Sequence, residues 1–395
     1  MTPTTPTPPA LIFGAHIAAL GALRILVEHG VRCYVVDDTP NIITRSRWYR
    51  RPKTTLVESP DSATLDAYLQ ELPFEHAVLV ACSDQWALAV SGLPEATRER
   101  FPTSLCSHEV IEQLVDKDRF RALAERLDLP RPRSRVIRDL DDLAQASDEE
   151  LDGGFLKPTE SHRHNRTFGT KGFFIESREA AQRLVETARA AGITFMLQEW
   201  IPGDMSSTIL FDGFVDREGT TKAIVARRRV RMNPPRLANT ASDVTIPLSE
   251  VESCLPIVRR LLAELDFRGV FNIEFKYDAR DRTFKIIELN PRPFWLTSHI
   301  ARAGADLPWM SYRDALGLTV PEMGPYRIGR FGMYEIPDGA AILRAWSRGS
   351  RPEGPVLRPW LTGDRALFWW RDPLPAVADV THILGRRVNR WLGRS

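Results

Sequence analysis

The sequence predicts an α/β protein that begins with a parallel sheet and continues into an α+β part built around an antiparallel hairpin. Residues 11–36 read as a strand, a glycine turn, a helix that ends at Gly30 and a second strand, which is how a parallel βαβ sheet begins. Within residues 269–293, residues 270–277 alternate apolar and polar side chains, a polar cluster follows at 278–282, and residues 283–289 read as a second strand. That alternation is typical of strands with one buried face.

The composition is that of a globular protein with two or three domains. The chain has 395 residues, of which 43% are hydrophobic and 26% charged, with a net charge of +2. Disorder, a strongly anionic partner for the whole molecule and a membrane-spanning class are therefore disfavoured. Four cysteines without metal-ligand spacing indicate free thiols and a cytoplasmic location. Residues 1–10 lack signal-peptide features, and we expect a flexible leader there.

The N-terminal unit, residues 11–113, is predicted to be a Rossmann-like parallel-sheet domain. Nicotinamide binding is the obvious alternative, because acids follow the second strand about twenty residues after the glycine turn. It is disfavoured because His16 stands where a second glycine would let the backbone approach a pyrophosphate. A further strand, residues 76–82, ends just before Asp84, where open sheets place their ligand crevices. Asp84 is a candidate substrate contact, and a simple helix N-cap is an equally open interpretation.

The hairpin carries a candidate metal site. If even-numbered residues pair with even-numbered ones, Glu274, Glu288 and Asn290 project from the same side. Two carboxylates and an amide oxygen suit Mg²⁺ that bridges to phosphate, and Arg292 lies within reach of the same anion. The alternative is that these are ordinary polar residues on a solvated face.

The string E-L-N-P-R-P at 288–293 resembles the C-terminal metal motif of the ATP-grasp superfamily of carboxylate-amine and carboxylate-thiol ligases. The resemblance implies a two-lobed ATP-grasp domain over 114–325, with a first lobe at 114–190 and a second at 191–325. It makes Glu274 the first metal carboxylate, Glu288 the bridging one and Asn290 the third ligand of Mg²⁺, with Mn²⁺ as an alternative ion. Arg292 becomes a phosphate or acyl-phosphate contact.

Three lysines are candidate phosphate ligands. The resemblance assigns this role to Lys117, at the start of a predicted helix, and to Lys157 in the string F-L-K-P. A lysine in an apolar strand needs an anion, which supports the role of Lys157. Where relatives have a glycine-rich flap, residues 161–172 form a cationic loop that includes Lys171, and we expect a lid over the nucleotide. A solvated helix lysine and a basic surface loop are the plainer alternatives.

Residues 194–204 resemble the superfamily's adenine hinge. The residues implied to contact the nucleotide there are Gln198, Glu199, Trp200, Ile201 and Asp204. Asp204 is preferred to Glu199 for the ribose hydroxyls. The following strands carry a run of arginines, and the resemblance implies that one of them stabilises the acyl-phosphate oxyanion, Arg231 first and then Arg229.

The C-terminal tail, residues 326–395, has 12 Arg, no Lys and half of the tryptophans. Such a stretch raises nucleic acid or a membrane surface as partners. We prefer an amphipathic helix docked on the body, because apolar residues recur at helical spacing from 380 to 392. The tail also resembles that of carboligase-like ATP-grasp proteins, the branch that looks closest to D-aspartate ligases and mycosporine-glycine synthetases.

These resemblances imply an ATP-dependent ligase. It would activate a small-molecule carboxylate as its acyl phosphate and join it to an amine, such as that of an amino acid, with release of ADP and phosphate. No nucleic acid or membrane partner is expected, and a homodimer is left open. The alternatives are a carboxylate-thiol ligase or kinase that uses the same nucleotide site, and a non-catalytic ATP-binding protein.

Overall fold

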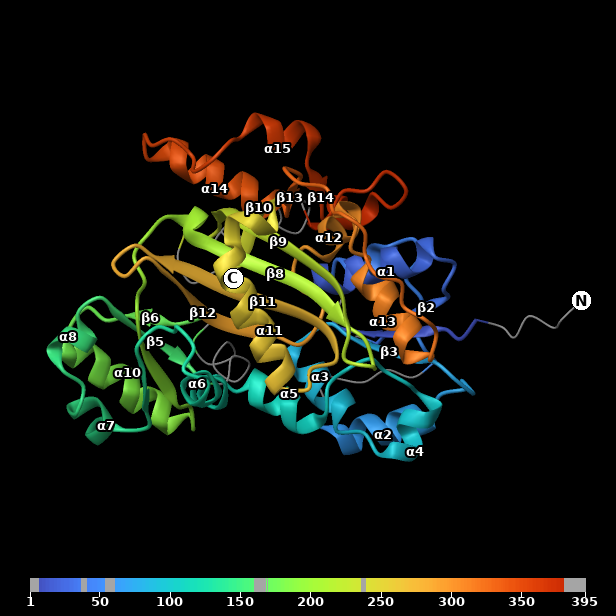
Figure 1. The fold of residues 1–395 in the computed structure, drawn as a ribbon, viewed down its shortest axis with the longest axis horizontal. Coiled ribbons are helices and arrows are strands. Elements are labelled where there is room, and N and C mark those ends of the chain that lie inside the picture. The colour runs from blue at the N-terminus through green and yellow to red at the C-terminus, as the bar shows by residue number, and fades with distance from the viewer. Residues whose placement is uncertain are drawn as a thin grey trace, which may run out of the picture.

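The computed structural model describes residues 7–36, 41–53, 61–159, 168, 170–235 and 239–379. Within this part of the chain the strands form three sheets, of three, four and seven strands. Figure 1 shows the large sheet in the middle of the molecule. The four-stranded sheet and its helices lie at one end and the N-terminal sheet at the other, with the C-terminal helices along one edge.

The N-terminal sheet is parallel, as predicted, with the order β2-β1-β3. Helix α1 packs on one face of it, while α2, α3 and α5 cover the other. Gly14, with φ +129°, makes the turn from β1 into α1. The elements are β1 (Ala10–Phe13), α1 (Ile17–Glu28), β2 (Cys33–Val36), η1 (Ile43–Arg45), α2 (Ser62–Gln70), β3 (Val78–Ala81), α3 (Asp84–Ser91), α4 (Glu95–Arg100) and α5 (His108–Val115).

The four-stranded sheet has the order β4-β7-β5-β6, and its pairs are antiparallel. Helix α10 covers it with Ala181, Val185 and Ala188, which recur at helical spacing and are buried. The elements are α6 (Lys117–Arg126), β4 (Ser134–Ile137), α7 (Leu140–Ala144), α8 (Asp148–Leu151), β5 (Gly154–Pro158), β6 (Phe173–Phe174), α10 (Arg178–Ala190) and β7 (Phe195–Glu199).

The large sheet has the order β12-β11-β8-β9-β10-β13-β14. One face packs on α11 through phenylalanines of β8 and β11. The opposite face is apolar where it meets α12 and α13 and polar beyond them. Its elements are η2 (Met205–Ser207), β8 (Thr208–Val215), β9 (Thr221–Met232), β10 (Thr240–Ile246), η3 (Leu248–Cys254), α11 (Leu255–Glu264), β11 (Gly269–Asp278), β12 (Thr283–Asn290), α12 (Thr297–Ala303) and α13 (Leu307–Ala315).

The C-terminal region contributes strands to the large sheet as well as helices that cover it. Strand β13 pairs antiparallel with β10, and β14 pairs parallel with β13. The elements are β13 (Phe331–Met333), α14 (Glu335–Ser347), α15 (Leu357–Thr362) and β14 (Asp364–Arg365). Beyond them, buried Asp372 accepts a hydrogen bond from Arg24 of α1 at 3.0 Å. The predicted helix at 380–392 lies outside the described residues.

None of the helices in the described ranges is both long enough and apolar enough to cross a bilayer.

Candidate active site

A cleft of about 370 Å³ lies where the three sheets approach one another. The four-stranded sheet forms one wall, the polar face of the large sheet forms the other, and the N-terminal sheet closes one end. The predicted site residues that line it are Lys117, Lys157, Lys171, Gln198, Glu199, Trp200, Ile201, Arg229, Glu274, Glu288, Asn290 and Arg292. Residues far apart in the sequence are thus gathered in one place.

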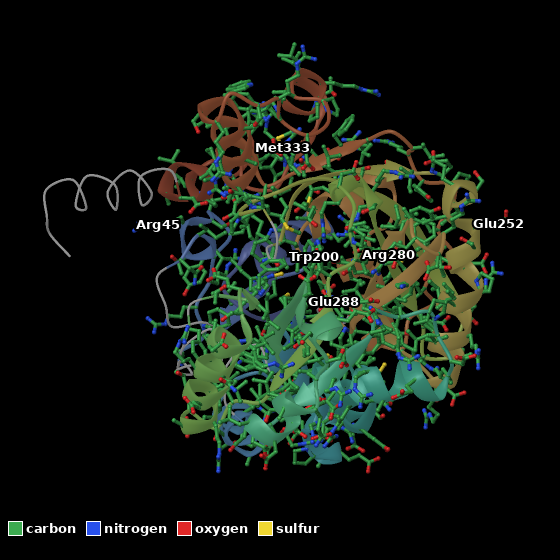
Figure 2. All side chains as sticks on the ribbon, turned by 90° about the vertical axis from the view of Figure 1, so that its left-hand side faces the viewer. Arg45, Trp200, Glu252, Arg280, Glu288 and Met333 are labelled. Atoms are coloured by element: carbon green, nitrogen blue, oxygen red, sulfur yellow. The ribbon has the colours of Figure 1, made fainter. Side chains whose placement is uncertain are left out.

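The hairpin has the register on which the metal prediction depends. Glu274 lies opposite Glu288, and Asn272 lies opposite Asn290, so even-numbered residues pair with even-numbered ones at the candidate ligands. Toward the turn, a register shift after Glu274 pairs Phe275 with Ile286 instead. The Glu274 carboxylate accepts a hydrogen bond from Arg229 at 2.8 Å, and the Glu288 carboxylate accepts one from Asn290 Nδ2 at 3.1 Å. In Figure 2 Glu288 lies centrally, below Trp200 and Arg280 in that view.

The donor set fits a hard cation that keeps some of its ligands outside the protein. Among the described residues no group of three or more His, Cys, Asp or Glu side chains could hold a metal. The hairpin supplies two carboxylates and one amide oxygen instead. Mg²⁺ usually binds proteins through one or two carboxylates and takes its remaining ligands from water and phosphate.

The three lysines bring positive charge to the same cleft. Burial and, after it, the neighbouring charge of Lys117 lower the pKa of Lys157 to about 8, while Glu288 and Glu274 oppose the shift. The side chain of Lys157 makes no hydrogen bond or ion pair with the described residues. Burial also lowers the pKa of Lys171, whose Nζ donates to Asn239 Oδ1. Cations held in this way would be stabilised by an anion in the cleft.

The lid predicted at 161–172 lies largely outside the described residues, which include Phe168 and the segment from Thr170 onward.

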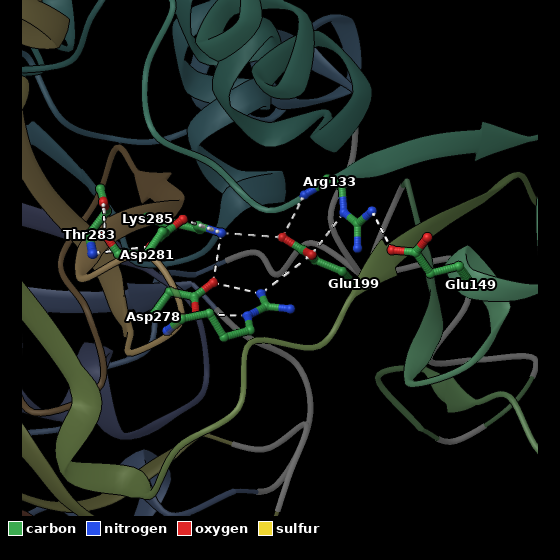
Figure 3. A network of polar contacts seen from close by, with 8 residues as sticks. Arg133, Glu149, Glu199, Asp278, Asp281, Thr283 and Lys285 are labelled. Atoms are coloured by element: carbon green, nitrogen blue, oxygen red, sulfur yellow. Dashed lines mark hydrogen bonds and ion pairs between the residues drawn. The ribbon is translucent and has the colours of Figure 1, made fainter.

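The side chain of Glu199 is held by cations of the chain itself (Figure 3). It accepts hydrogen bonds from the backbone N–H of Arg133 at 3.0 Å and from Arg133 Nε at 3.1 Å. Lys285 and Arg280, on the β11–β12 hairpin, lie 3.5 and 3.4 Å from its oxygens. Burial would raise the pKa of Glu199, but Arg133, Lys285 and Arg280 outweigh burial and lower it. Glu199 therefore joins the hinge strand β7 to the turn of the hairpin.

Of the backbone N–H groups of Glu199, Trp200 and Ile201, one makes no bond to the described residues. The N–H of Glu199 donates to Arg133 O at 3.0 Å, and that of Trp200 donates to Gly153 O at 3.2 Å. The N–H of Ile201 remains. Beside it the Trp200 ring packs on Phe155 with centroids 5.7 Å apart, and both rings line the cleft as an apolar wall suited to a flat ring.

Two predicted residues are not brought into the cleft. Asp204 is exposed, and its carboxylate caps η2 by accepting from Ser207 N at 3.1 Å, although its charge still acts on the cleft residue Lys276. Arg231 is buried and donates to both oxygens of Asp338 in α14, at 2.7 and 3.0 Å. It was the first choice for the oxyanion contact, and the structure places the second choice, Arg229, in the cleft instead.

The irregular pairing of β9 with β10 accounts for the position of Arg231. Arg229 pairs with Asp243, and Arg231 pairs with Ser242, so Val230 is an extra residue between them. Such a bulge changes the direction of the strand and the aim of its side chains. The arginine run showed alternation but gave no sign of the bulge.

The N-terminal sheet closes the cleft with a charged pair. Arg292 donates to both oxygens of Asp84 at 2.6 and 2.9 Å. Asp84 is the first residue of α3, whose N-cap is Ser83, so the N-cap interpretation of Asp84 was wrong. His16 caps α1 by accepting from Ala18 N at 3.3 Å, and burial together with Arg292 lowers its pKa to about 4.

Several residues of the cleft carried no sequence signal as site residues. Examples are Lys276, Asn239 and Thr240, which depend on contacts between strands distant in the sequence. Phe294 and Trp295 also line the cleft, and they directly follow the E-L-N-P-R-P string, in a segment where the resemblance implies that substrate is often recognised.

No family model matches the chain. Solved structures with the same architecture are ligases and carboxylases of the ATP-grasp fold. An N5-carboxyaminoimidazole ribonucleotide synthetase in complex with ADP has a TM-score of 0.63 at 15% identity, covering 88% of this chain and 87% of that one. The L-amino acid ligase of Bacillus licheniformis has a TM-score of 0.59 at 12% identity over 83% and 79%. The chain has the ATP-grasp fold, as predicted.

Sequence relatives fall in the same fold class. D-aspartate ligase of Enterococcus faecium is 26% identical over 223 residues, which are 54% of this chain and 53% of the relative. The carbamoyl phosphate synthase large chain of Methanoculleus marisnigri is 22% identical over 323 residues, 76% of this chain and 28% of the relative. The chain thus spans about half, or less, of the length of these relatives.

Proposed function

We propose that the protein is an ADP-forming ligase that uses Mg²⁺ and ATP to activate a carboxylate and joins it to an amine, with an amino acid as the amine substrate. One observation carries the proposal: three lysines face two carboxylates and an amide oxygen across one cleft. The lysines suit a polyphosphate, and the oxygen ligands suit the cation that accompanies it. The sequence likeness to a D-aspartate ligase supports an amino acid as one of the two substrates.

The residues present fit ATP. The wall of Phe155, Trp200 and Ile201 would hold the adenine, with the Ile201 N–H as a donor. Lys117, Lys157 and Lys171 would hold the phosphates. A cation bound to the hairpin would neutralise charge on the phosphate that is transferred.

The chemistry needs positioning and charge stabilisation more than a covalent nucleophile. Arg229, fixed by Glu274 and by Thr240 Oγ1 at 2.9 Å, would steady the developing oxyanion with its guanidinium. Arg292 would contact the acyl phosphate from the other end of the cleft. The carboxylate substrate would then lie between these two arginines.

The decisive experiment is a screen of ADP release over a matrix of amino acids and small carboxylates, with Mg²⁺ and ATP. We expect release only when a particular acid and amine are both present, and a hydroxamate when hydroxylamine replaces the amine. A stable phosphorylated product would indicate a kinase, and a thioester formed with a thiol would indicate a carboxylate-thiol ligase. Nucleotide binding without ADP release from any mixture would overturn the assignment as an enzyme.

A further inference from the structure

We infer that Asn272 is a positioning residue that fixes the side-chain amide of Asn290 with its oxygen toward the cation. This inference rests on the proposed function of the cleft. Asn272 lies on β11 directly opposite Asn290 of β12, and its side chain is 0% exposed. It does not line the cleft and has no place in the E-L-N-P-R-P string.

The orientation of Asn290 matters because its amide has two different ends. Only the oxygen can bind a cation, whereas the NH₂ group would repel one. In the structure Asn290 Nδ2 donates to Asn272 Oδ1 at 3.4 Å and to Glu288 Oε1 at 3.1 Å. The opposite end, Asn290 Oδ1, accepts from Arg292 Nη2 at 3.3 Å. A flipped amide would point its donors at Arg292 and its acceptor at the oxygens of Glu288 and Asn272.

Of the two acceptors for Asn290 Nδ2, Asn272 is the one that is not itself a candidate ligand. A cation bound to Glu288 would draw electron density from its carboxylate, so the hydrogen bond that Glu288 accepts from Asn290 would weaken when the cation is bound. Asn272 is buried behind the ligands and keeps its bond in both states. Groups behind a metal ligand commonly set the ligand's orientation in this way.

Asn272 is held in its own orientation by a buried acid. Its Nδ2 donates to Asp212 Oδ1 at 2.9 Å, so its oxygen has to face Asn290. The other oxygen of Asp212 accepts from Arg227 Nε and Nη2 at 2.8 and 2.6 Å, and Arg227 also donates to Asp243. All three residues behind Asn272 are at most 3% exposed. In the series of hydrogen bonds that links Arg227, Asp212, Asn272 and Asn290, it is thus determined which group donates and which accepts.

The test uses Mn²⁺ as the probe, with the non-hydrolysable analogue adenylyl imidodiphosphate, and measures free Mn²⁺ by electron paramagnetic resonance. Asn272→Leu removes the acceptor, together with the donor to Asp212, and keeps the branched shape of the side chain. We expect its Mn²⁺ dissociation constant to rise by ~10–100-fold, as for other residues behind metal ligands. Binding of the nucleotide without metal should change less than about threefold, because Asn272 does not reach the cleft.

A charge swap provides the rescue. Asn272→Asp alone places two carboxylates side by side and should weaken Mn²⁺ binding as well. When it is combined with Asp212→Asn, the amide introduced at position 212 can donate to the carboxylate introduced at position 272, while its oxygen still accepts from Arg227. The carboxylate at position 272 can in turn accept from Asn290. We expect the double variant to recover Mn²⁺ affinity to within about threefold of the original protein. Should Asn272→Leu not fold, the near-isosteric single and double swaps carry the same comparison.

Val225→Ala is the matched control, because Val225 is a buried residue of the same sheet that pairs with Asp212. It should lower the melting temperature without changing the Mn²⁺ affinity. Unchanged Mn²⁺ binding in Asn272→Leu, no recovery in the double variant, or equal weakening in Val225→Ala would overturn the inference and leave the proposed function standing. An original protein that binds no Mn²⁺ with the analogue would instead overturn the proposed metal site.

Discussion

Arg292 and Asp84 form a bidentate ion pair, with donor–acceptor distances of 2.6 and 2.9 Å, that joins the end of the β11–β12 hairpin to the N-terminal sheet. The two residues are 208 positions apart in the sequence. Asp84 begins α3 at the carboxyl end of β3, which is where a parallel sheet presents its ligand-binding residues. The N-terminal domain therefore contributes directly to the cleft.

We predict that Asp84→Asn destabilises the protein at neutral pH and much less in acid. Burial raises the pKa of Asp84, but Arg292 outweighs it and the pKa is lowered overall. The stabilisation is therefore present above the unfolded pKa of about 4 and is lost as the pH falls through the folded pKa. Because the Asp84 side chain is 34% exposed, we expect a loss of about 1–2 kcal/mol rather than that of a fully buried pair. Urea unfolding of the original protein and of Asp84→Asn at pH 7 and pH 3 measures this loss of stability. An equal loss at both pH values would contradict the prediction.

The sequence was most informative where the alternation of a strand determines on which face a candidate site residue lies. Glu274 and Glu288 share a face because the hairpin alternates, and the structure has that register. The string after Glu288 then indicated the metal set, and the apolar strand around Lys157 indicated a buried cation. Each of these signals lies within one short segment, so local periodicity was sufficient.

We predict that Glu288→Gln raises the Mg²⁺ concentration needed for half-maximal ADP release at least ~10-fold, because one of two carboxylates is lost from the candidate metal site. The matched control is Glu264→Gln, at the end of α11, which in the described part of the chain makes a long contact of 3.7 Å with Arg126. It should leave the Mg²⁺ dependence unchanged. A fully active Glu288→Gln at limiting Mg²⁺ would contradict the metal assignment.

We predict that Asp204, and not Glu199, reads the ribose. Glu199 lines the cleft, but its carboxylate is already held by Arg133, Lys285 and Arg280. Asp204 lies outside the cleft lining but is exposed, and its charge acts on the cleft residue Lys276, so we expect it to meet a ribose that extends from the cleft. Asp204→Asn should reduce the preference for ATP over 2′-deoxy-ATP by about 1 kcal/mol, the value of one hydrogen bond.

The comparison variant, Glu199→Gln, should keep that preference and instead lower the melting temperature, because it loosens the link between hinge and hairpin (Figure 3). Isothermal titration calorimetry with both nucleotides measures the preference. If Glu199→Gln abolishes it and Asp204→Asn does not, the assignment is reversed.

We predict that nucleotide binding takes up protons at pH 8–9. Burial lowers the pKa of Lys157 to about 8, so in this range the free protein holds part of its Lys157 uncharged. A bound phosphate raises that pKa again, and the lysine gains a proton. Calorimetry in two buffers of different ionisation enthalpy should show uptake of up to about one proton, most of which disappears in Lys157→Met.

The same variant should be more stable than the original protein at pH 7. A lysine with a lowered folded pKa binds fewer protons folded than unfolded, so its charge opposes folding below that pKa. Lys157→Met removes this penalty, and we expect a gain of ~1 kcal/mol in urea unfolding together with loss of nucleotide affinity. Absence of proton uptake in the original protein would contradict the placement of Lys157 at the phosphates.

The positions that sequence reasoning did not predict depend on contacts between distant segments. Arg231 was misplaced because a bulge at Val230 cannot be read from a run of arginines. The hinge N–H groups of Glu199 and Trp200 are used by Arg133 and Gly153, which no local pattern shows. The C-terminal strands β13 and β14 are only three and two residues long and too short for a periodic signal.

Arg229 and Arg231 provide a matched pair that separates catalysis from stability. Arg229 faces the cleft and contacts Glu274, while Arg231 donates to Asp338 and to the backbone oxygens of Glu353 and Pro355, at 2.9 and 2.8 Å. A lysine cannot reproduce either set of planar, multiple bonds. The two conservative changes should therefore damage different properties.

Arg229→Lys should lower kcat by ~100-fold or more, as expected when a donor to a developing oxyanion is lost, with a small change in melting temperature. Arg231→Lys should cost about 3 kcal/mol of stability, because it leaves the buried carboxylate of Asp338 poorly paired, while the folded fraction keeps its kcat. Steady-state kinetics with active-site titration and urea unfolding of both variants distinguish these effects. A loss of kcat in Arg231→Lys as large as in Arg229→Lys, measured at full folding, would restore Arg231 as the oxyanion contact and contradict the geometry of the cleft.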